Sequence, residues 1–197
     1  MTATSPVEHL YKFEEYLTYD DGTNNRYELF RGRLILMTPP TVRHLLIAKF
    51  LERILDAEIN RLKLALVALR EAGLQTEVDS SRLPDVCVVT EEQVSELMDE
   101  TAVFRVPARL AVEIVSLSSV KRDYEEKPPE YANKGIPEYW IVDPIKNQVT
   151  VCFLMNGRYE STVFTNTQQI ISRIFPELVL TVEQTLTTRS GENDIAQ

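Results

Sequence analysis

The segment Val42–Leu62, VRHLLIAKFLERILDAEINRL, decides the fold class, because it has the pattern of a long helix and strand-like runs follow it. Its stripe at three-and-four spacing comprises His44, Ile47, Ala48, Leu51, Leu55, Glu58 and Leu62, with Ile54 and Ile59 beside it. This spacing is that of one helix face. Pro39-Pro40 ends the segment before it, and Thr41 is a plausible N-cap. A helix with one apolar stripe packs on another layer, so we expect it to cover one face of a sheet.

The runs after this helix predict that sheet. They are Leu64–Leu69, Leu74–Val78, Asp85–Thr90 and Arg109–Val115, with a polar helix at Glu91–Met98 before the last. Val86, Val88 and Val89 leave little polar surface, which is typical of an interior strand covered on both faces. The sequence therefore predicts an α/β fold with a mixed, twisted β-sheet flanked by helices.

The remaining elements lie on both sides of this block. Upstream we expect a short helix at Val7–Tyr16, a polar turn at Asp20–Asn25, and a hairpin of Arg26–Phe30 with Arg33–Met37 through Arg31-Gly32. Downstream, Val120–Lys134 is helical over part of its length, and Gly135 can close it as a C-cap. The strand Glu138–Val142 follows, then a hairpin of Gln148–Leu154 with Arg158–Phe164 through Asn156-Gly157.

Length and composition indicate one globular domain. The chain has 197 residues, of which 44% are hydrophobic and 26% charged, and it has no internal repeat. We expect a single domain over residues 1–197, with 1–25 as an N-terminal extension and about 188–197 as a frayed tail. We see neither a signal peptide nor the roughly 18 uninterrupted apolar residues of a membrane helix, and we therefore expect a cytoplasmic protein.

Two cysteines, Cys87 and Cys152, lie in apolar strand-like runs. Buried free thiols are the preferred interpretation over a disulfide, and they fit a reducing cytosol. The cysteines have no zinc-finger spacing.

The net charge of −9 argues against a passive nucleic-acid binder, which normally has a basic surface. It is compatible with an enzyme that holds cations in a carboxylate site. Any affinity for DNA would then come from local basic patches, bound metal ions or a partner.

Two carboxylates interrupt apolar strands. Asp85 opens the run Pro-Asp-Val-Cys-Val-Val, and Glu113 interrupts Leu-Ala-Val-Glu-Ile-Val. An ionised carboxylate is costly to bury unless an ion pair, hydrogen bonds or a metal compensates it. Mg²⁺ prefers oxygen ligands and commonly takes one or two carboxylates with water and substrate phosphate. Asp85 alone could be a strand-entry turn and Glu113 alone a structural ion pair, but together they indicate a site.

Three further residues are candidates, each with a plainer interpretation. Lys127 follows Glu113 by fourteen positions on the next helix, where it could be a solvated surface charge. Glu28 is a carboxylate among apolar neighbours in Tyr-Glu-Leu-Phe. His44 lies on the apolar stripe of the long helix, where a histidine is more often a satisfied core residue than a catalyst.

The order of several short motifs resembles a known family. The strings are Val112-Glu-Ile-Val-Ser, Lys121-Arg-Asp, Lys127-x-x-x-Tyr131 and Gly135-Ile-Pro-Glu-Tyr-Trp-Ile-Val-Asp-Pro144. Earlier blocks are Tyr27-Glu-Leu with Gly32 and Leu34, Pro39-Pro40 with Arg43-His44, and Leu83-Pro-Asp-Val86. The ordered set spans about Tyr27 to Phe164 and is similar to the Uma-two endonuclease family, a bacterial branch of the PD-(D/E)XK superfamily.

The resemblance implies a restriction-endonuclease-like core and hydrolysis of phosphodiester bonds in nucleic acid, DNA above all, with Mg²⁺ as the cofactor and Mn²⁺ as the alternative. Asp85 and Glu113 would be the metal-binding carboxylates, and Lys127 the catalytic lysine. The superfamily usually has that lysine two residues after the glutamate, where this chain has Val115. Glu28 matches an acid of the first block, and His44 a family histidine.

One departure from the family bears on activity. Pro128-Pro129 follows Lys127 directly, so the helix either begins at Lys127 or is kinked there. The rival interpretation is a catalytically silent nucleic-acid- or protein-binding module that retains the fold. We also expect a homodimer, because double-strand cleavage needs two active sites, and Leu64–Leu69 is a candidate strand for pairing across its interface.

Overall fold

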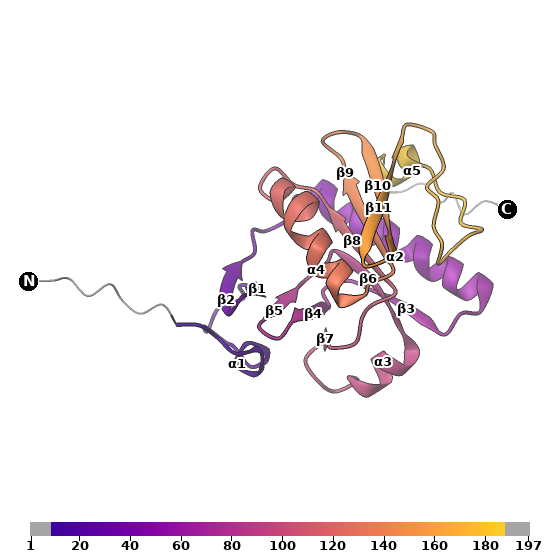
Figure 1. Ribbon diagram of the computed structural model, residues 1–197. Coiled ribbons are helices and arrows are strands. Elements are labelled where there is room, and N and C mark those ends of the chain that lie inside the picture. The colour runs from indigo at the N-terminus through magenta and orange to yellow at the C-terminus, as the bar shows by residue number, and fades with distance from the viewer. Residues whose placement is uncertain (1–8, 188–197) are drawn as a thin grey trace, which may run out of the picture.

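The computed structural model describes residues 9–187, and its core is two mixed β-sheets flanked by helices (Figure 1). The strand order is β11-β10-β9-β8-β6-β3 in the six-stranded sheet and β2-β1-β5-β4-β7 in the five-stranded sheet. The predicted α/β class is confirmed, with the strands divided between two sheets. None of the helices within residues 9–187 combines the length and apolarity needed to cross a membrane.

Each sheet contains one parallel pair, β8 with β9 and β4 with β7, and is otherwise antiparallel. The six-stranded sheet comprises β3 (Leu66–Leu69), β6 (Val86–Thr90), β8 (Leu110–Ile114), β9 (Glu138–Asp143), β10 (Gln148–Met155) and β11 (Arg158–Thr165). The five-stranded sheet comprises β1 (Tyr27–Phe30), β2 (Arg33–Leu36), β4 (Gly73–Glu77), β5 (Ser80–Arg82) and β7 (Val103–Phe104). The helices are α1 (Phe13–Leu17), α2 (Val42–Leu62), α3 (Glu91–Glu96), α4 (Lys127–Lys134) and α5 (Val182–Leu186), with a π-turn η1 (Arg122–Glu126).

Helix α2 has the predicted bounds and packs on one face of the six-stranded sheet. Its buried Leu51 and Leu55 belong to the same core cluster as Val88 and Val112. The Oγ1 of Thr41 accepts a hydrogen bond from the His44 backbone N–H at 3.2 Å, which confirms the predicted N-cap.

The opposite face of this sheet packs against α4. Alternate residues of the same strands, among them Cys87 and Ala111, form a second core cluster with Tyr131 of α4. Both faces are therefore covered, as the apolar sequence of β6 predicted. Cys87 and Cys152 are buried free thiols, as expected.

Between β3 and β6 the chain passes from the six-stranded sheet to the five-stranded sheet and back, and the return follows Arg82. It leaves the six-stranded sheet after β3, forms the β4–β5 hairpin of the five-stranded sheet, and returns through Leu83-Pro84 into β6. Arg82 and Asp85 therefore lie on either side of this crossing, where side chains from both sheets meet.

The helix predicted at Val7–Tyr16 is wrong in its extent, because α1 spans Phe13–Leu17. Residues 7 and 8 lie outside the described part of the chain, and residues 9–12 are not helical. The backbone N–H of Tyr11 donates to the Gly32 carbonyl at 2.7 Å, so this segment pairs with the β1–β2 turn instead. Phe13 then packs on Leu29 and Val103.

Other predicted elements are confirmed to within about two residues, and three short ones were not predicted. Both hairpin turns have the expected left-handed residues, Arg31-Gly32 and Asn156-Gly157. The missed elements are β5, β7 and α5, which have three, two and five residues and are too short to show a period. The tail predicted from about residue 188 lies outside the described residues, and the division into domain, extension and tail stays a prediction.

The proline pair is accommodated by a π-turn directly before it. The Lys127 N–H donates to the Arg122 carbonyl, five residues back, and α4 then begins at Lys127. Pro128 and Pro129 fall in the first turn of α4, where a missing N–H costs little. The wider π-turn also separates the proline rings from the carbonyls that they would meet in a continuous α-helix.

Candidate active site

Strand pairing brings the two predicted carboxylates together. Val86 of β6 is paired with Val112 of β8 in antiparallel register, so the next position places Asp85 opposite Glu113. Residues opposite each other in an antiparallel pair point to the same face, with Cβ atoms about 5 Å apart. The Asp85 Oδ2 also accepts a hydrogen bond from the Ile114 N–H at 2.7 Å, which ties this carboxylate to β8.

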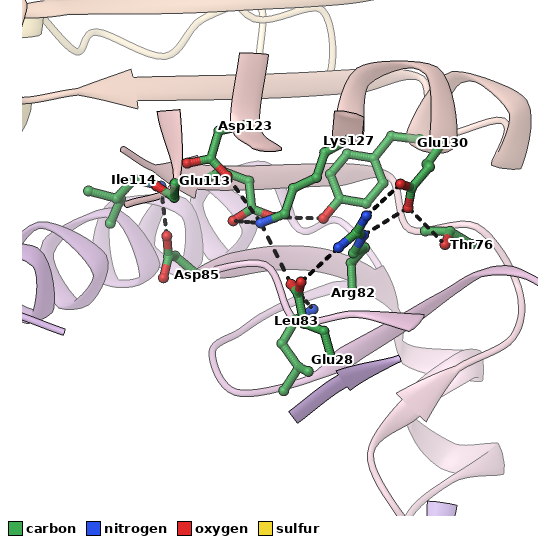
Figure 2. Close-up of polar contacts among 12 residues, drawn as sticks. Glu28, Thr76, Arg82, Leu83, Asp85, Glu113, Ile114, Asp123, Lys127 and Glu130 are labelled. Atoms are coloured by element: carbon green, nitrogen blue, oxygen red, sulfur yellow. Dashed lines mark hydrogen bonds and ion pairs between the residues drawn. The ribbon is translucent and has the colours of Figure 1, made fainter. Parts of the chain in front are cut away.

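The Lys127 ammonium lies among three carboxylates (Figure 2). Its Nζ is 2.8 Å from Glu113 Oε2, 3.2 Å from Asp123 Oδ1 and 3.7 Å from Glu28 Oε1. The side chain is 4% exposed, so it is not the solvated surface charge of the plainer interpretation. Lys127, the lysine predicted on the next helix, therefore does reach Glu113. The π-turn and the two prolines leave its side chain directed toward that carboxylate.

Glu28 joins the cluster from the other sheet. Its Oε2 accepts from Arg82 Nη1 at 2.9 Å, and its Oε1 accepts from the Leu83 backbone N–H at 3.2 Å. Burial disfavours the charged carboxylate, but Lys127 and Arg82 outweigh that effect and lower its pKa. Glu28 is thus an ionised link between the two sheets.

Arg82 extends the network one turn further along α4, to Glu130 (Figure 2). Its Nε and Nη2 donate to the two carboxylate oxygens of Glu130 at 2.8 and 2.6 Å. Thr76 donates to Glu130 Oε2 at 3.3 Å. This bidentate pair holds α4 against the five-stranded sheet.

His44 contacts Asp85 from the first turn of α2. The distance from His44 Nε2 to Asp85 Oδ1 is 2.6 Å, and the two side chains are 16% and 21% exposed. His44 is therefore a partner of a candidate site residue and no core residue. This end of the cluster is the part that reaches solvent.

Glu113 is buried, and its pKa is raised despite two close partners. The Tyr131 hydroxyl donates to its Oε1 at 2.6 Å. Burial raises the pKa of Glu113 to about 8, although the neighbouring Lys127 opposes the rise. Burial likewise raises the pKa of Asp123. Burial alone would lower the pKa of Lys127, but the carboxylates around it raise it. One ammonium thus faces three acids, which cannot all ionise at no cost.

The donor set fits a hard divalent cation on chemical grounds. Among residues 9–187, no three His, Cys, Asp or Glu side chains are grouped to hold a metal by themselves. Mg²⁺, however, commonly takes only one or two carboxylates and completes its shell with water and phosphate. Asp85 and Glu113 supply that pair, and the excess of buried negative charge beside them is what a cation would neutralise.

Sequence reasoning did not identify Asp123, Arg82 or Glu130 as part of the cluster. Asp123 precedes Lys127 by four residues, a spacing that brings helical side chains together, and this signal was available. Arg82 and Glu130 gave no local signal, because each lies in a polar stretch and they meet only through the crossing between the sheets.

Comparison with known proteins agrees with this architecture. A family model described as Uma2, "Putative restriction endonuclease", matches residues 13–183. A solved structure, the "putative nuclease belonging to DUF820" from Anabaena variabilis ATCC 29413, superposes with a TM-score of 0.75 at 18% sequence identity. The alignment covers 89% of this chain and 97% of that one, and the likeness shows the fold. Among curated proteins, no sequence matches this chain.

Proposed function

Because the chain belongs to the Uma2 family of restriction-endonuclease-like nucleases, we propose that it is a metal-dependent endonuclease that hydrolyses phosphodiester bonds in DNA. One observation carries the proposal. Asp85 directly precedes β6 and accepts from the Ile114 N–H of the neighbouring β8, next to Glu113, and the ammonium of Lys127 lies 2.8 Å from Glu113. Two carboxylates and a cationic side chain are the groups that metal-assisted attack of water on a phosphate requires.

Each residue has a proposed role. Asp85 and Glu113 would hold Mg²⁺ or Mn²⁺, and such an ion, when bound, polarises the scissile phosphate and lowers the pKa of a coordinated water. Lys127 would orient the attacking water and offset the charge that develops on the phosphate oxygens. His44 would fix the Asp85 carboxylate through its 2.6 Å contact.

Glu28 would position the Lys127 side chain. Its carboxylate lies 3.7 Å from the ammonium and is itself fixed by Arg82 and by the Leu83 N–H. This arrangement supports a role for Glu28 in holding the lysine.

A second candidate, a catalytically silent binding module, is favoured by one specific observation. Glu113 and Lys127 are both about 4% exposed and already paired with each other. A pair of this kind can be purely structural. The two candidates differ in one measurable respect, because only the enzyme needs a divalent cation in order to act.

A cleavage assay tests the proposal. The wild type, Glu113→Gln and Lys127→Met would be incubated with supercoiled DNA, linear DNA and single-stranded RNA, in Mg²⁺, Mn²⁺, Ca²⁺ or a chelator. Lys134→Met is the matched control, since Lys134 lies on the same helix at its far end. We expect Mg²⁺- or Mn²⁺-dependent cleavage of DNA by the wild type and the control, and a loss of about a hundredfold in Lys127→Met. Equal cleavage by wild type and Lys127→Met would refute the role of the lysine, and no cleavage in any condition would favour the silent module.

We also propose that the protein is a homodimer and works in the cytoplasm. Strand β3 forms one edge of the six-stranded sheet. Its Ala68 N–H donates to Asp56, and the rest of its outer side would pair with a second copy. Two buried free thiols support a reducing compartment. Light scattering at micromolar concentration tests the first statement, and a mass equal to one chain would contradict it.

A further inference from the structure

Asp123 is a buried acid without a hydrogen-bond partner. Its side chain is 1% exposed, and neither carboxylate oxygen has hydrogen-bond geometry with any residue between positions 9 and 187. The closest charged group is the Lys127 ammonium, 3.2 Å from Oδ1. An unsatisfied carboxylate is costly to bury. A fold that keeps one beside a candidate site lysine therefore calls for an explanation beyond packing.

Hydrogen bonds from both sides fix the main chain of Asp123. The Lys127 N–H donates to the Arg122 carbonyl, and Pro128 has no N–H, so the Asp123 carbonyl lacks a donor from its own helix. The Tyr139 hydroxyl, from strand β9, supplies that donor at 2.8 Å. On the other side, the Asp123 N–H donates to Ser119 at 2.9 Å. The backbone of Asp123 is thus tied to the same sheet that carries Glu113.

The three carboxylates around Lys127 are not equivalent. Glu113, at 2.8 Å, is the one that a cation would share. Glu28, at 3.7 Å, is already engaged by Arg82 and a backbone N–H. Within residues 9–187, the charged partner of the Asp123 carboxylate is Lys127 alone. A divalent cation at Glu113 would repel the ammonium over a few ångströms, and Asp123 is then the acceptor that keeps the ammonium in place.

We propose that Asp123 is a positioning residue for Lys127, holding its ammonium beside Glu113 while that carboxylate is shared with a cation. The inference rests on the proposed nuclease function for its consequence in catalysis. The positioning itself concerns the Lys127 ammonium and the carboxylates around it. It also accounts for the carboxylate without a hydrogen bond, because that carboxylate faces the Lys127 ammonium at 3.2 Å.

The variant Asp123→Asn removes the charge and keeps the shape, and Asp143→Asn is its matched control. Asp143 is equally buried at 1%, but its Oδ1 accepts from the backbone N–H groups of Ile145 and Lys146. Because Lys127 keeps Glu113 and Glu28 as counter-charges when Asp123 is neutralised, we expect Asp123→Asn to unfold at the same denaturant concentration as wild type or a higher one, whereas Asp143→Asn unfolds earlier. In wild type, ¹⁵N-lysine spectra should contain a protected Lys127 ammonium signal, assigned by its absence in Lys127→Met. It should shift or broaden in Asp123→Asn and stay unchanged in Asp143→Asn.

In the cleavage assay, we expect Asp123→Asn to lower kcat by roughly tenfold to a hundredfold, since a misplacement of about 1 Å has that effect. KM and the metal-binding isotherm should stay within about twofold of wild type, and Asp123→Glu should recover part of kcat. An unchanged Lys127 signal, or a loss of stability as large as that of Asp143→Asn, would overturn the inference and make Asp123 a structural residue. If no variant cleaves any substrate, the proposed function fails, and the ammonium signal still decides the positioning role.

Discussion

Replacing Arg82 by methionine should unfold the protein at a much lower denaturant concentration. The guanidinium is 1% exposed, pairs with Glu28 and with both oxygens of Glu130, and lies 4.5 Å from the Phe30 ring centroid. Arg82→Met keeps an apolar stem of similar length and removes the charge. Glu130 then stays buried without its counter-charge, and Glu28 loses one of its two.

Removing one partner of a buried ion pair costs about 3–5 kcal/mol of unfolding free energy. For a chain of this size, 1 kcal/mol corresponds to about 2–4 °C in Tm, so the expected loss is roughly 6–20 °C. The contacts also predict which acid carries most of that cost. Glu28 keeps the Leu83 N–H and Lys127. Glu130 keeps, within the described residues, only the Thr76 hydroxyl at 3.3 Å.

The second mutation therefore distinguishes the two acids. Arg82→Met/Glu130→Gln should recover more of the lost unfolding free energy than Arg82→Met/Glu28→Gln, as measured by urea titration with unchanged m-value. Arg61→Met is the control, because Arg61 also pairs with two glutamates, Glu58 and Glu177, but its side chain is 50% exposed. An exposed network of this kind is worth about 1 kcal/mol or less. Equal losses for Arg82→Met and Arg61→Met, or equal recovery by the two double variants, would refute the reasoning.

Three further results are expected. The pKa of Glu113 is raised from 4.5 to about 8 in the folded protein. The contribution of Glu113 to the free energy of unfolding is therefore present below pH 4.5 and is lost as the pH rises toward 8. Urea titrations in chelator should show this decline in wild type and a smaller one in Glu113→Gln. Glu113→Gln should also weaken Mn²⁺ binding sharply in calorimetry, and an isotherm equal to that of wild type would remove Glu113 from the ligands. Burial raises the pKa of the Cys87 thiol to about 12 and also raises that of Cys152; native protein at pH 8 should resist iodoacetamide while unfolded protein reacts at both cysteines, and rapid native alkylation would show that the strands around them open.

The elements that the sequence predicted are those whose pattern is local. Helix α2 and the hairpin through Asn156-Gly157 have periods and turn residues that extend over enough positions to be read directly. Strands β5 and β7 do not, since they have three and two residues; β5 pairs with β4 in a hairpin and, through Ser81, with Leu29, more than fifty residues away. Pairings of that range leave no trace in three residues of sequence.

The candidate site divides in the same way. Asp85 and Glu113 are conspicuous because an acid inside an apolar strand is unusual, and the motif order pointed to Lys127. The division of the strands into two sheets, and with it the meeting of Arg82 with Glu28 and Glu130, depends on tertiary packing that no local window contains. The π-turn was predictable only in part. Pro128-Pro129 indicated that the helix is disturbed, but not that the Lys127 N–H donates to the Arg122 carbonyl.

The wide separation of the clustered residues along the chain has a consequence for biosynthesis. Glu28, Arg82 and Glu113 leave the ribosome before Lys127, and the hydroxyl that fixes the turn before α4 comes later still, from Tyr139. A nascent chain therefore carries the acids without the ammonium until α4 and β9 have emerged. Truncated products that end before Lys127 lack the lysine altogether. The complete cluster, with the hydrogen bond from Tyr139, can therefore form only in chains whose synthesis has passed β9.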